Sequence, residues 1–444
     1  MKRFFSNEDL KKLIVPLIID QFLQAFVGLA DSIMVASVGE AAVSGVSLID
    51  TVMVLIINIF TALATGGAVI AGQFIGKQKE AEACKATNQL LLFTVKASVV
   101  VMALGYLGRN VILHGIFGKI DADVMYNCNI YLLIVFASIP MIAVYNAGAA
   151  IFRSMGNSTI AMITSLIMNA VNLGGNAVLI YGCHRGIEGV AIPTLVSRCV
   201  AAAIILVLLN NQSRQIHIFH PFSFHTDWNL LKKILYIGIP NGLENSMFQL
   251  GKILVLSLVS TFGTYAIAAN AVSNAIALFQ ILPGMAISLA ITTVISQCVG
   301  ANDYEQVRYY LKKLLAIIYV AMVGTVALIF LALPLILKAY NLSDQTAAAA
   351  TNIIHFHGIS AMIIWPLSFA LPAAYRAAGD AKACMYTSIV SMWIFRIGFS
   401  YLVGKYMGLG VFGVWIAMVI DWVVRAICFI IRYFNGKWKH GAIV

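Results

Sequence analysis

Two carboxylates lie inside the first long apolar stretch of the sequence, residues 13–39. In a helix of this length, Asp20 and Asp31 are almost three turns apart and point the same way, and Gln24 follows Asp20 by one turn on that face. An acid inside a membrane span is costly unless it faces a cavity or a partner, so Asp31 is a candidate ion-binding residue. Asp20 could play the same part, or it could lie near the inner interface as a cap.

The composition is that of a polytopic membrane protein. Of the 444 residues 61% are hydrophobic and 11% are charged, and the mean hydropathy is +0.90, whereas soluble domains carry about 25% charged residues. We expect the first apolar stretch to be an uncleaved helix, because Asp20 interrupts it and no A-x-A cleavage site follows. The 7 cysteines are scattered without a C-x-x-C pair, so we expect neither disulfides nor a metal cage.

Hydropathy predicts an all-α protein of twelve transmembrane helices. The predicted spans are approximately 13–37, 46–74, 88–113, 126–151, 158–181, 187–210, 230–260, 267–298, 310–335, 350–374, 382–404 and 411–433.

The distribution of Lys and Arg predicts the orientation of these spans. One set of loops, together with both termini, holds nineteen Lys and Arg residues, and the opposite loops hold five. By the positive-inside rule both termini are cytoplasmic, in a multi-pass protein of the plasma (inner) membrane. The net charge of +11 therefore reports topology, and we expect no nucleic-acid partner.

The chain is also internally duplicated. A shift of 224 residues places Pro16 on Pro240, Asp20 on Glu244 and Gly76 on Gly300. A shift of 223 residues places Arg153 on Arg376 within a second matching segment.

The duplication predicts two six-helix lobes related by a pseudo-two-fold axis along the membrane normal. The N-terminal lobe covers residues 1–210, a cytoplasmic linker covers 211–229, and the C-terminal lobe covers 230–444. This organisation is typical of transporters. The sequence shows neither a channel filter nor the nucleophile or metal cluster of an enzyme.

Several motifs, in order along the chain, resemble those of the multidrug and toxic compound extrusion (MATE) transporters, prokaryotic type. They are Ala30-Asp31-Ser32-Ile33-Met34, Gln73-Phe74-Ile75-Gly76-Lys77, Phe152-Arg153-Ser154-Met155-Gly156-Asn157, residues 172–182 and residues 186–194. The resemblance implies alternating-access export of organic cations or other amphipathic compounds, driven by inward Na+ or H+, with no cofactor.

The resemblance also implies an ion-coupling site made of Asp31, Asn172, Asn176 and Thr194. One carboxylate, two amides and a hydroxyl form a small oxygen cage that suits Na+, or a proton on Asp31. Asn176 stands where some relatives have a second Asp, which leaves Na+ and H+ both open. Apart from this possible Na+, we expect no metal.

The second half departs from the family pattern. Its seventh span holds Glu244 and Lys252, two turns apart, which could neutralise each other. With Asp20 and Gln24, these two residues are possible secondary coupling or substrate residues. Further along, Arg396 lies within a span, and we expect Asp421 and Arg425, spaced i, i+4, to lie near the inner end of their span or to pair structurally.

A flippase for a lipid-linked sugar or other amphipathic lipid precursor is the alternative function. Flippases of this kind often have a basic central cavity, and Lys252 and Arg396 fit one. Under either function we expect small amphipathic substrates, a lipid bilayer as the environment, and a monomer, since the duplication alone requires no oligomer.

The predicted orientation can be tested with single cysteines at Gln78, Arg214 and Asp303, in a background without native cysteines. All three should react with an impermeant maleimide only from the cytoplasmic side. Labelling of position 78 or 303 from outside intact cells would contradict the twelve-span arrangement with cytoplasmic termini.

Overall fold

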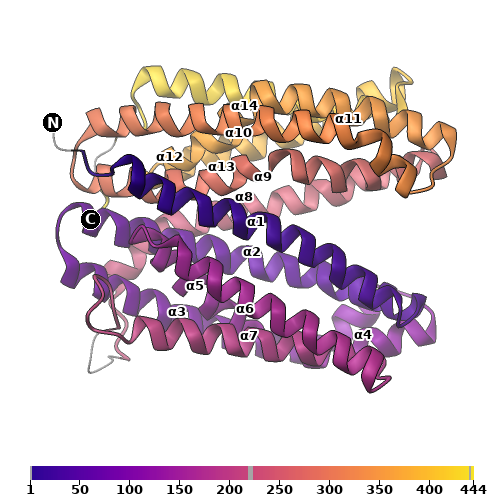
Figure 1. Cartoon of the computed structure of the whole chain (residues 1–444), viewed down its shortest axis with the longest axis horizontal. Coiled ribbons are helices and arrows are strands. Elements are labelled where there is room, and N and C mark those ends of the chain that lie inside the picture. The colour runs from indigo at the N-terminus through magenta and orange to yellow at the C-terminus, as the bar shows by residue number, and fades with distance from the viewer. Residues whose placement is uncertain (1–2, 219–223, 440–441) are drawn as a thin grey trace. The chain divides into compact units, whose positions relative to one another are not determined.

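The computed structural model describes residues 3–218, 224–439 and 442–444, which form helices and connecting turns without any strand. The helices (Figure 1) are α1 (Asn7–Ala36), α2 (Glu40–Gly76), α3 (Glu80–Leu107), α4 (Ala122–Phe136), α5 (Ile139–Ser154), α6 (Ser158–Asn176), α7 (Glu188–Leu209), α8 (Trp228–Ser260), α9 (Thr264–Gly300), α10 (Tyr304–Ala339), α11 (Asp344–Trp365), α12 (Leu371–Ala377), α13 (Ala381–Ser391) and α14 (Gly410–Asn435). Five π-helical segments adjoin them: η1 (Val111–Ile116), η2 (Ala177–Gly182), η3 (Pro366–Ala370), η4 (Met392–Gly398) and η5 (Ser400–Tyr406).

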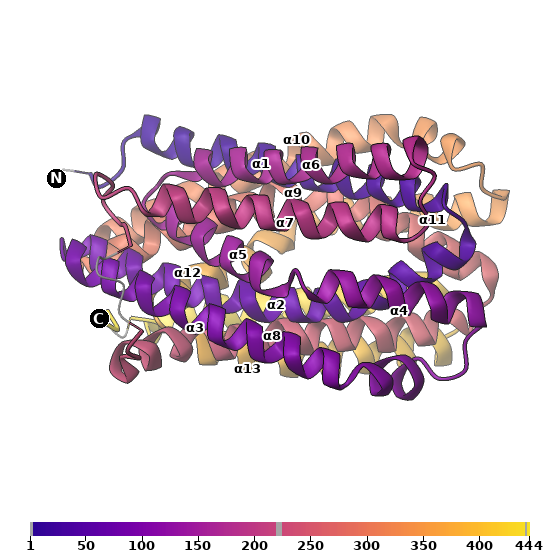
Figure 2. The same ribbon diagram turned by 90° about the horizontal axis from the view of Figure 1, so that it is seen from below.

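The described residues contain 10 helical segments that are long and apolar enough to cross a membrane, and the bent pair α4–α5 makes 11. The axes of α4 and α5 differ by 49° (Figure 2). Pro140 lies in the first turn of α5, next to this bend. Proline has no N–H to continue the helix before it, which accounts for a break at this point. The remaining predicted span corresponds to α8, whose 33 residues are long enough but include the polar Asn241, Glu244 and Lys252.

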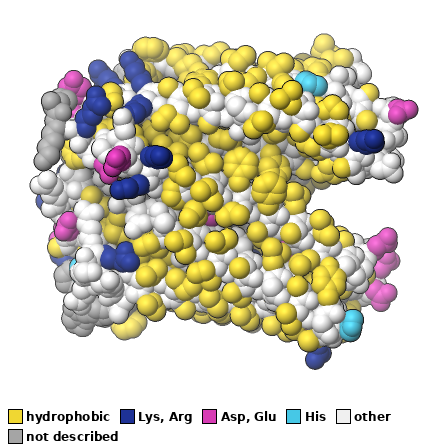
Figure 3. All heavy atoms as spheres, in the orientation of Figure 1, with side chains coloured by type: hydrophobic (Ala, Val, Ile, Leu, Met, Phe, Trp, Pro, Cys, Tyr) yellow, Lys and Arg dark blue, Asp and Glu magenta, His cyan; other side chains and the backbone are white. Residues whose placement is uncertain are grey.

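On the face shown in Figure 3, hydrophobic side chains cover the middle stretches of the helices. Most of the visible Lys and Arg side chains gather at the helix ends, chiefly at the end where α1 begins. This is the surface distribution expected of helices that lie in a bilayer.

The described chain divides into two compact units. The N-terminal unit comprises Lys11–Gly242 with Val444, and the C-terminal unit comprises Met1–Leu10 with Leu243–Ile443. The boundary therefore lies inside α8, later than the predicted linker at residues 211–229.

The contacts of α8 explain why its first half belongs to the N-terminal unit. A Cβ on Gly66 of α2 would lie 2.5 Å from the carbonyl oxygen of Ile234 and 2.9 Å from the nitrogen of Gly238. Such distances exclude any side chain at position 66, so α2 and the first half of α8 cross backbone to backbone.

The first residues of the chain instead pack with α10. The Phe5 N–H donates to the Tyr310 hydroxyl (2.8 Å), and that hydroxyl donates back to the Phe5 carbonyl (2.7 Å). The Phe4 N–H donates to Gln306 at 2.9 Å. These bonds give the N-terminal segment its place in the C-terminal unit.

The crossing of α2 and α8 generates a stability prediction. Gly66→Ala should destabilise the protein by about 1–3 kcal/mol, because the new methyl group meets backbone that cannot rotate away. The matched control is Gly324→Ala on α10, where an added Cβ meets nothing within 4 Å. Thermal unfolding in detergent should show a lower midpoint for the first variant only. Equal midpoints would contradict the backbone contact.

Candidate functional site

In the N-terminal unit, Asp31 of α1 lies beside Asn176, the last residue of α6. The Asn176 amide donates to the Asp31 Oδ1 at 2.6 Å. The Oδ1 atoms of both Asn172 and Asn176 are buried and accept no hydrogen bond from the described residues. Because a buried acceptor without a partner is costly, these two oxygens are available to accept a hydrogen bond from a ligand or from an added proton.

Thr194 of α7 is buried, and its hydroxyl donates to the Val190 carbonyl in the same helix at 2.9 Å. Its oxygen lone pairs stay available, but no contact of the hydroxyl with Asp31 is seen. Figures 1 and 2 both show α6 and α7 side by side. The part of Thr194 in an ion site therefore stays a prediction.

Three further residues belong to this cluster, and the sequence reasoning missed them. The Tyr131 hydroxyl of α4 donates to Asp50 of α2 at 3.1 Å. Arg198 of α7 donates to the Ser138 hydroxyl at 2.7 Å, and its charge interacts with Asp31, Asp50 and Tyr131. Arg198 follows Thr194 by one helical turn, so the i, i+4 rule could have placed it on the same face.

Asp20 lies in a separate, buried cluster. It is 6% exposed and accepts a hydrogen bond from Gln24 at 3.0 Å, and the charge of Arg153 acts on it. Asp20 and Gln24 are thus together as predicted, away from the solvent-exposed position that a mere cap would have.

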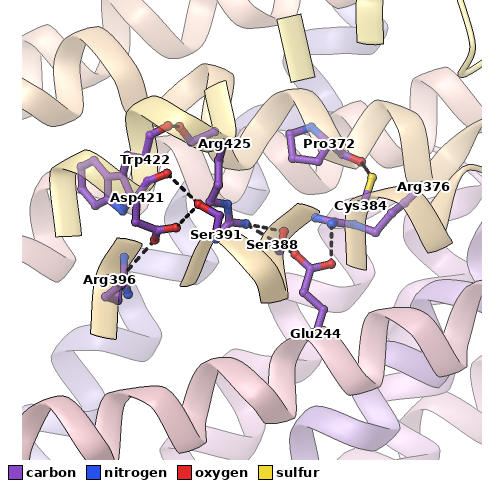
Figure 4. A network of polar contacts seen from close by, with 11 residues as sticks. Glu244, Pro372, Arg376, Cys384, Ser388, Ser391, Arg396, Asp421, Trp422 and Arg425 are labelled. Carbon is purple, nitrogen blue, oxygen red and sulfur yellow. Dashed lines mark hydrogen bonds and ion pairs between the residues drawn. The ribbon is translucent and has the colours of Figure 1, made fainter. Parts of the chain in front are cut away.

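In the C-terminal unit, the predicted Glu244–Lys252 pair is wrong. Glu244 instead accepts from Arg376 at 3.1 Å and from Arg425 at 3.5 Å (Figure 4). The Lys252 ammonium lies 5.0 Å from the centre of the Phe248 ring and pairs with no acid among the described residues. Two helical turns separate positions 244 and 252 by about 12 Å along α8, which is too far for an ion pair.

The predicted pairing of Asp421 with Arg425 is also wrong. Asp421 pairs with Arg396 of η4 at 3.2 Å and accepts from Ser391 at 2.6 Å. Arg425 donates to Ser388 at 2.8 Å and reaches Glu244. Figure 4 shows the two guanidinium groups turned to different acids. Both acids are buried, so each requires a basic partner from another helix.

A cavity of about 390 Å³ adjoins this network. Its charged lining consists of Glu244, Lys252, Arg376, Arg396 and Arg425, and its ring-bearing lining consists of Phe248, His357, Trp365, Phe369, Trp415 and Trp422. The His357 ring nitrogen lies 2.5 Å from the Gln280 side-chain oxygen. The cavity is of the size that holds small organic ligands.

Comparison with known protein families assigns the chain to a family. The sequence model of the MatE family matches residues 16–178 and again residues 240–402, once in each half of the duplicated sequence. The chain therefore belongs to the MATE family, whose members are membrane transporters and not enzymes. The resemblance and the all-helical, two-half fold are confirmed.

Two curated relatives match almost end to end. The chain is 28% identical to the uncharacterised transporter YisQ of Bacillus subtilis, over 95% of this chain and 93% of that one. It is 24% identical to the probable multidrug resistance protein NorM of Thermotoga maritima, over 99% of this chain and 94% of that one. These matches favour an efflux transporter over the flippase alternative.

A solved structure shares the fold. It has a TM-score of 0.90 and 22% sequence identity, and the match covers 97% of this chain and 96% of that one. It is described as a MOP superfamily transporter from Pyrococcus furiosus with a binding pocket of reverse polarity, suggesting a different function.

The ion pair of Glu244 with Arg376 predicts a specific double-mutant cycle. Glu244→Gln should destabilise the protein because it leaves Arg376 and the buried Arg425 without their acid, and adding Arg376→Gln should restore part of the loss. The coupling should be about 0.5–3 kcal/mol.

The control cycle combines Glu244→Gln with Lys252→Gln, whose effects should add. Thermal unfolding midpoints of the purified variants measure both cycles. Additive effects in the Arg376 cycle, or coupling in the Lys252 cycle, would contradict the pairing seen in Figure 4.

Proposed function

We propose that this protein exports amphipathic organic compounds by alternating access in exchange for protons, with Asp31 as the coupling residue. The observation that carries the proposal is the hydrogen bond from Asn176 to Asp31, together with the buried Oδ1 atoms of Asn172 and Asn176, which accept no hydrogen bond from the described residues. A protonated Asp31 can donate to such an oxygen, whereas a deprotonated one cannot. Loading and unloading of the proton would then change the contacts between α1 and α6, which is what a coupling ion must do.

The residue at position 176 supports the choice of a proton over Na+. Two acids, Asp31 and Asp50, share the influence of the Arg198 guanidinium, and its positive charge disfavours Na+ binding and protonation alike. The Asn at position 176 leaves one carboxylate fewer among the oxygen ligands available to Na+. A proton bound to one carboxyl oxygen requires no set of oxygen ligands, so the missing carboxylate affects it less.

Further parts of the proposal rest on the sequence. We place the protein in the plasma membrane with both termini in the cytoplasm, from the distribution of Lys and Arg. We also propose that a monomer is the transporting unit.

The test of coupling uses purified protein in liposomes. The dye is whichever of ethidium, N-phenyl-1-naphthylamine and carboxyfluorescein the wild type moves fastest. Transport should follow an imposed pH gradient and ignore an imposed Na+ gradient. Asp31→Asn should reduce gradient-driven transport to that of empty liposomes, because the amide keeps the shape of the side chain and cannot take up the proton.

Asp20→Asn is the matched control, since it is the same substitution on the same helix. It should retain gradient-driven transport at equal protein content. Full transport by Asp31→Asn with loss in Asp20→Asn would move the coupling site to Asp20. Transport driven by Na+ alone would overturn proton coupling.

A further inference from the structure

The cavity of the C-terminal unit carries an excess of positive charge. Lys252, Arg376, Arg396 and Arg425 line it, and the acids that face them are Glu244 and Asp421. Four basic groups less two acids leaves a charge of +2. Uncompensated charge within membrane-spanning helices is costly, so a binding partner of opposite charge is favoured there.

Lys252 is the basic group of the cavity that contributes most directly to this excess of positive charge. Glu244 is already shared by Arg376 and Arg425, and Asp421 is held by Arg396 and Ser391. That leaves Lys252 with the Phe248 ring and no acid among the described residues, although its side chain lines the cavity. Its ammonium can thus donate to a ligand without breaking an existing ion pair.

Unused donors of the network add to the same polarity. The Nε1 of Trp422 and the Nε of Arg425 are buried and make no hydrogen bond with the described residues. Both residues line the cavity, and both atoms can only donate. A ligand that satisfied them would have to bring acceptors, as a carboxylate does.

The walls of the cavity are aromatic. The Trp365 and Phe369 rings stack at 5.3 Å between centroids, and Arg425 lies 4.4 Å from the centre of the Phe369 ring. Met285 and Met418 add flexible apolar surface. Such walls suit a flat apolar body, and 390 Å³ is near the lower end of ligand-sized pockets, about 300–1,000 Å³. A single small compound fits this volume better than a two-chain lipid.

We propose that this cavity is the substrate site and that it binds amphipathic organic anions, an aromatic carboxylate being the representative class. The inference rests on the proposed export function and deepens it by giving the charge of the exported compound. Lys252 contacts the carboxylate, and the aromatic walls hold the apolar body.

The experiment compares three naphthalene probes that share a ring system and differ in charge. They are naphthalene-2-carboxylate, the neutral naphthalene-2-carboxamide and the cationic (naphthalen-2-ylmethyl)trimethylammonium. Isothermal titration of each into the purified full-length protein in a non-ionic detergent, with detergent blanks, gives the affinities. The carboxylate should bind about tenfold tighter than the amide, as a charge-assisted hydrogen bond implies. The cation should bind weakest.

Variants at Lys252 test the residue. Lys252→Gln should weaken carboxylate binding about tenfold and leave the amide unchanged. Lys252→Glu should favour the cation over the carboxylate. The matched control is Lys405→Gln, on η5 of the same unit and outside the cavity, which should bind all three probes as the wild type does.

Tighter binding of the cation than of the carboxylate by the wild type would overturn the proposal, as would unchanged carboxylate affinity in both Lys252 variants. If those variants fail to fold, the order of the three probes on the wild type decides. The titrations use no gradient, so they separate the two proposals. If Asp31→Asn exported the dye at the wild-type rate, only the coupling proposal would be refuted. If the cation bound more tightly than the carboxylate, only the anion site would be refuted.

Discussion

The Glu244 carboxylate joins three helices of the C-terminal unit, since it lies on α8 and accepts from Arg376 of α12 and Arg425 of α14. Breaking such a buried ion pair is strongly destabilising, although the intact pair gains little over a well-packed apolar contact. The network therefore fixes which helices meet more than it adds net stability. Asp421 then pairs with Arg396, and Lys252 has no acid as a partner among the described residues.

The duplication gives this pairing a counterpart in the other half. The registers that place Asp20 on Glu244 and Arg153 on Arg376 relate two acids and two arginines, and the charge of Arg153 does act on Asp20. The same acid–arginine theme thus recurs in each unit at matching positions. This recurrence indicates a structural task for Asp20, distinct from the coupling task proposed for Asp31. The 224-residue shift aligns Asp31 with Val255 in the sequence, so the second half has no acid at the position equivalent to Asp31.

The two halves diverge at the positions of the two proposed sites. In the register that places Gly186 on Gly410, Thr194 corresponds to Met418 and Arg198 to Trp422, and both of those counterparts line the C-terminal cavity. Equivalent positions therefore belong to the two proposed sites, with polar side chains in the N-terminal unit and large, mainly apolar ones in the C-terminal unit. Such divergence after duplication fits two lobes with different ligands, a small ion in the first and an organic compound in the second.

Sequence alone predicted the features that depend on local spacing. Hydropathy and the repeat predicted the helices and the two halves, and the spacing of Asn172 and Asn176 placed both amides on one helix face. The grouping of these amides with Asp31 came from the family resemblance, and the structure shows the contact of Asn176 with Asp31. Prediction from the sequence failed where the ion-pair partner of a residue comes from a helix distant in the sequence. Glu244 and Lys252 share a span and have opposite charges, yet the helical rise keeps them apart, and the arginines that reach Glu244 lie more than a hundred residues away. The cluster of Asp50, Tyr131 and Arg198 draws on three helices, so only the Arg198 contribution had a local signal.

The charges of the two proposed ligands also fix how the membrane potential acts on transport. Exchange of an organic cation for a proton moves no net charge when the ratio is one to one. Exchange of an organic anion for a proton moves two charges in the same sense, because an anion leaving and a proton entering both carry positive charge inward. Each charge gains about 2.3 kcal/mol per 100 mV of inside-negative potential. A basic substrate cavity in one unit and a proton-binding acid in the other would thus make export respond to the potential as well as to the pH gradient, a combination that neither site would produce alone.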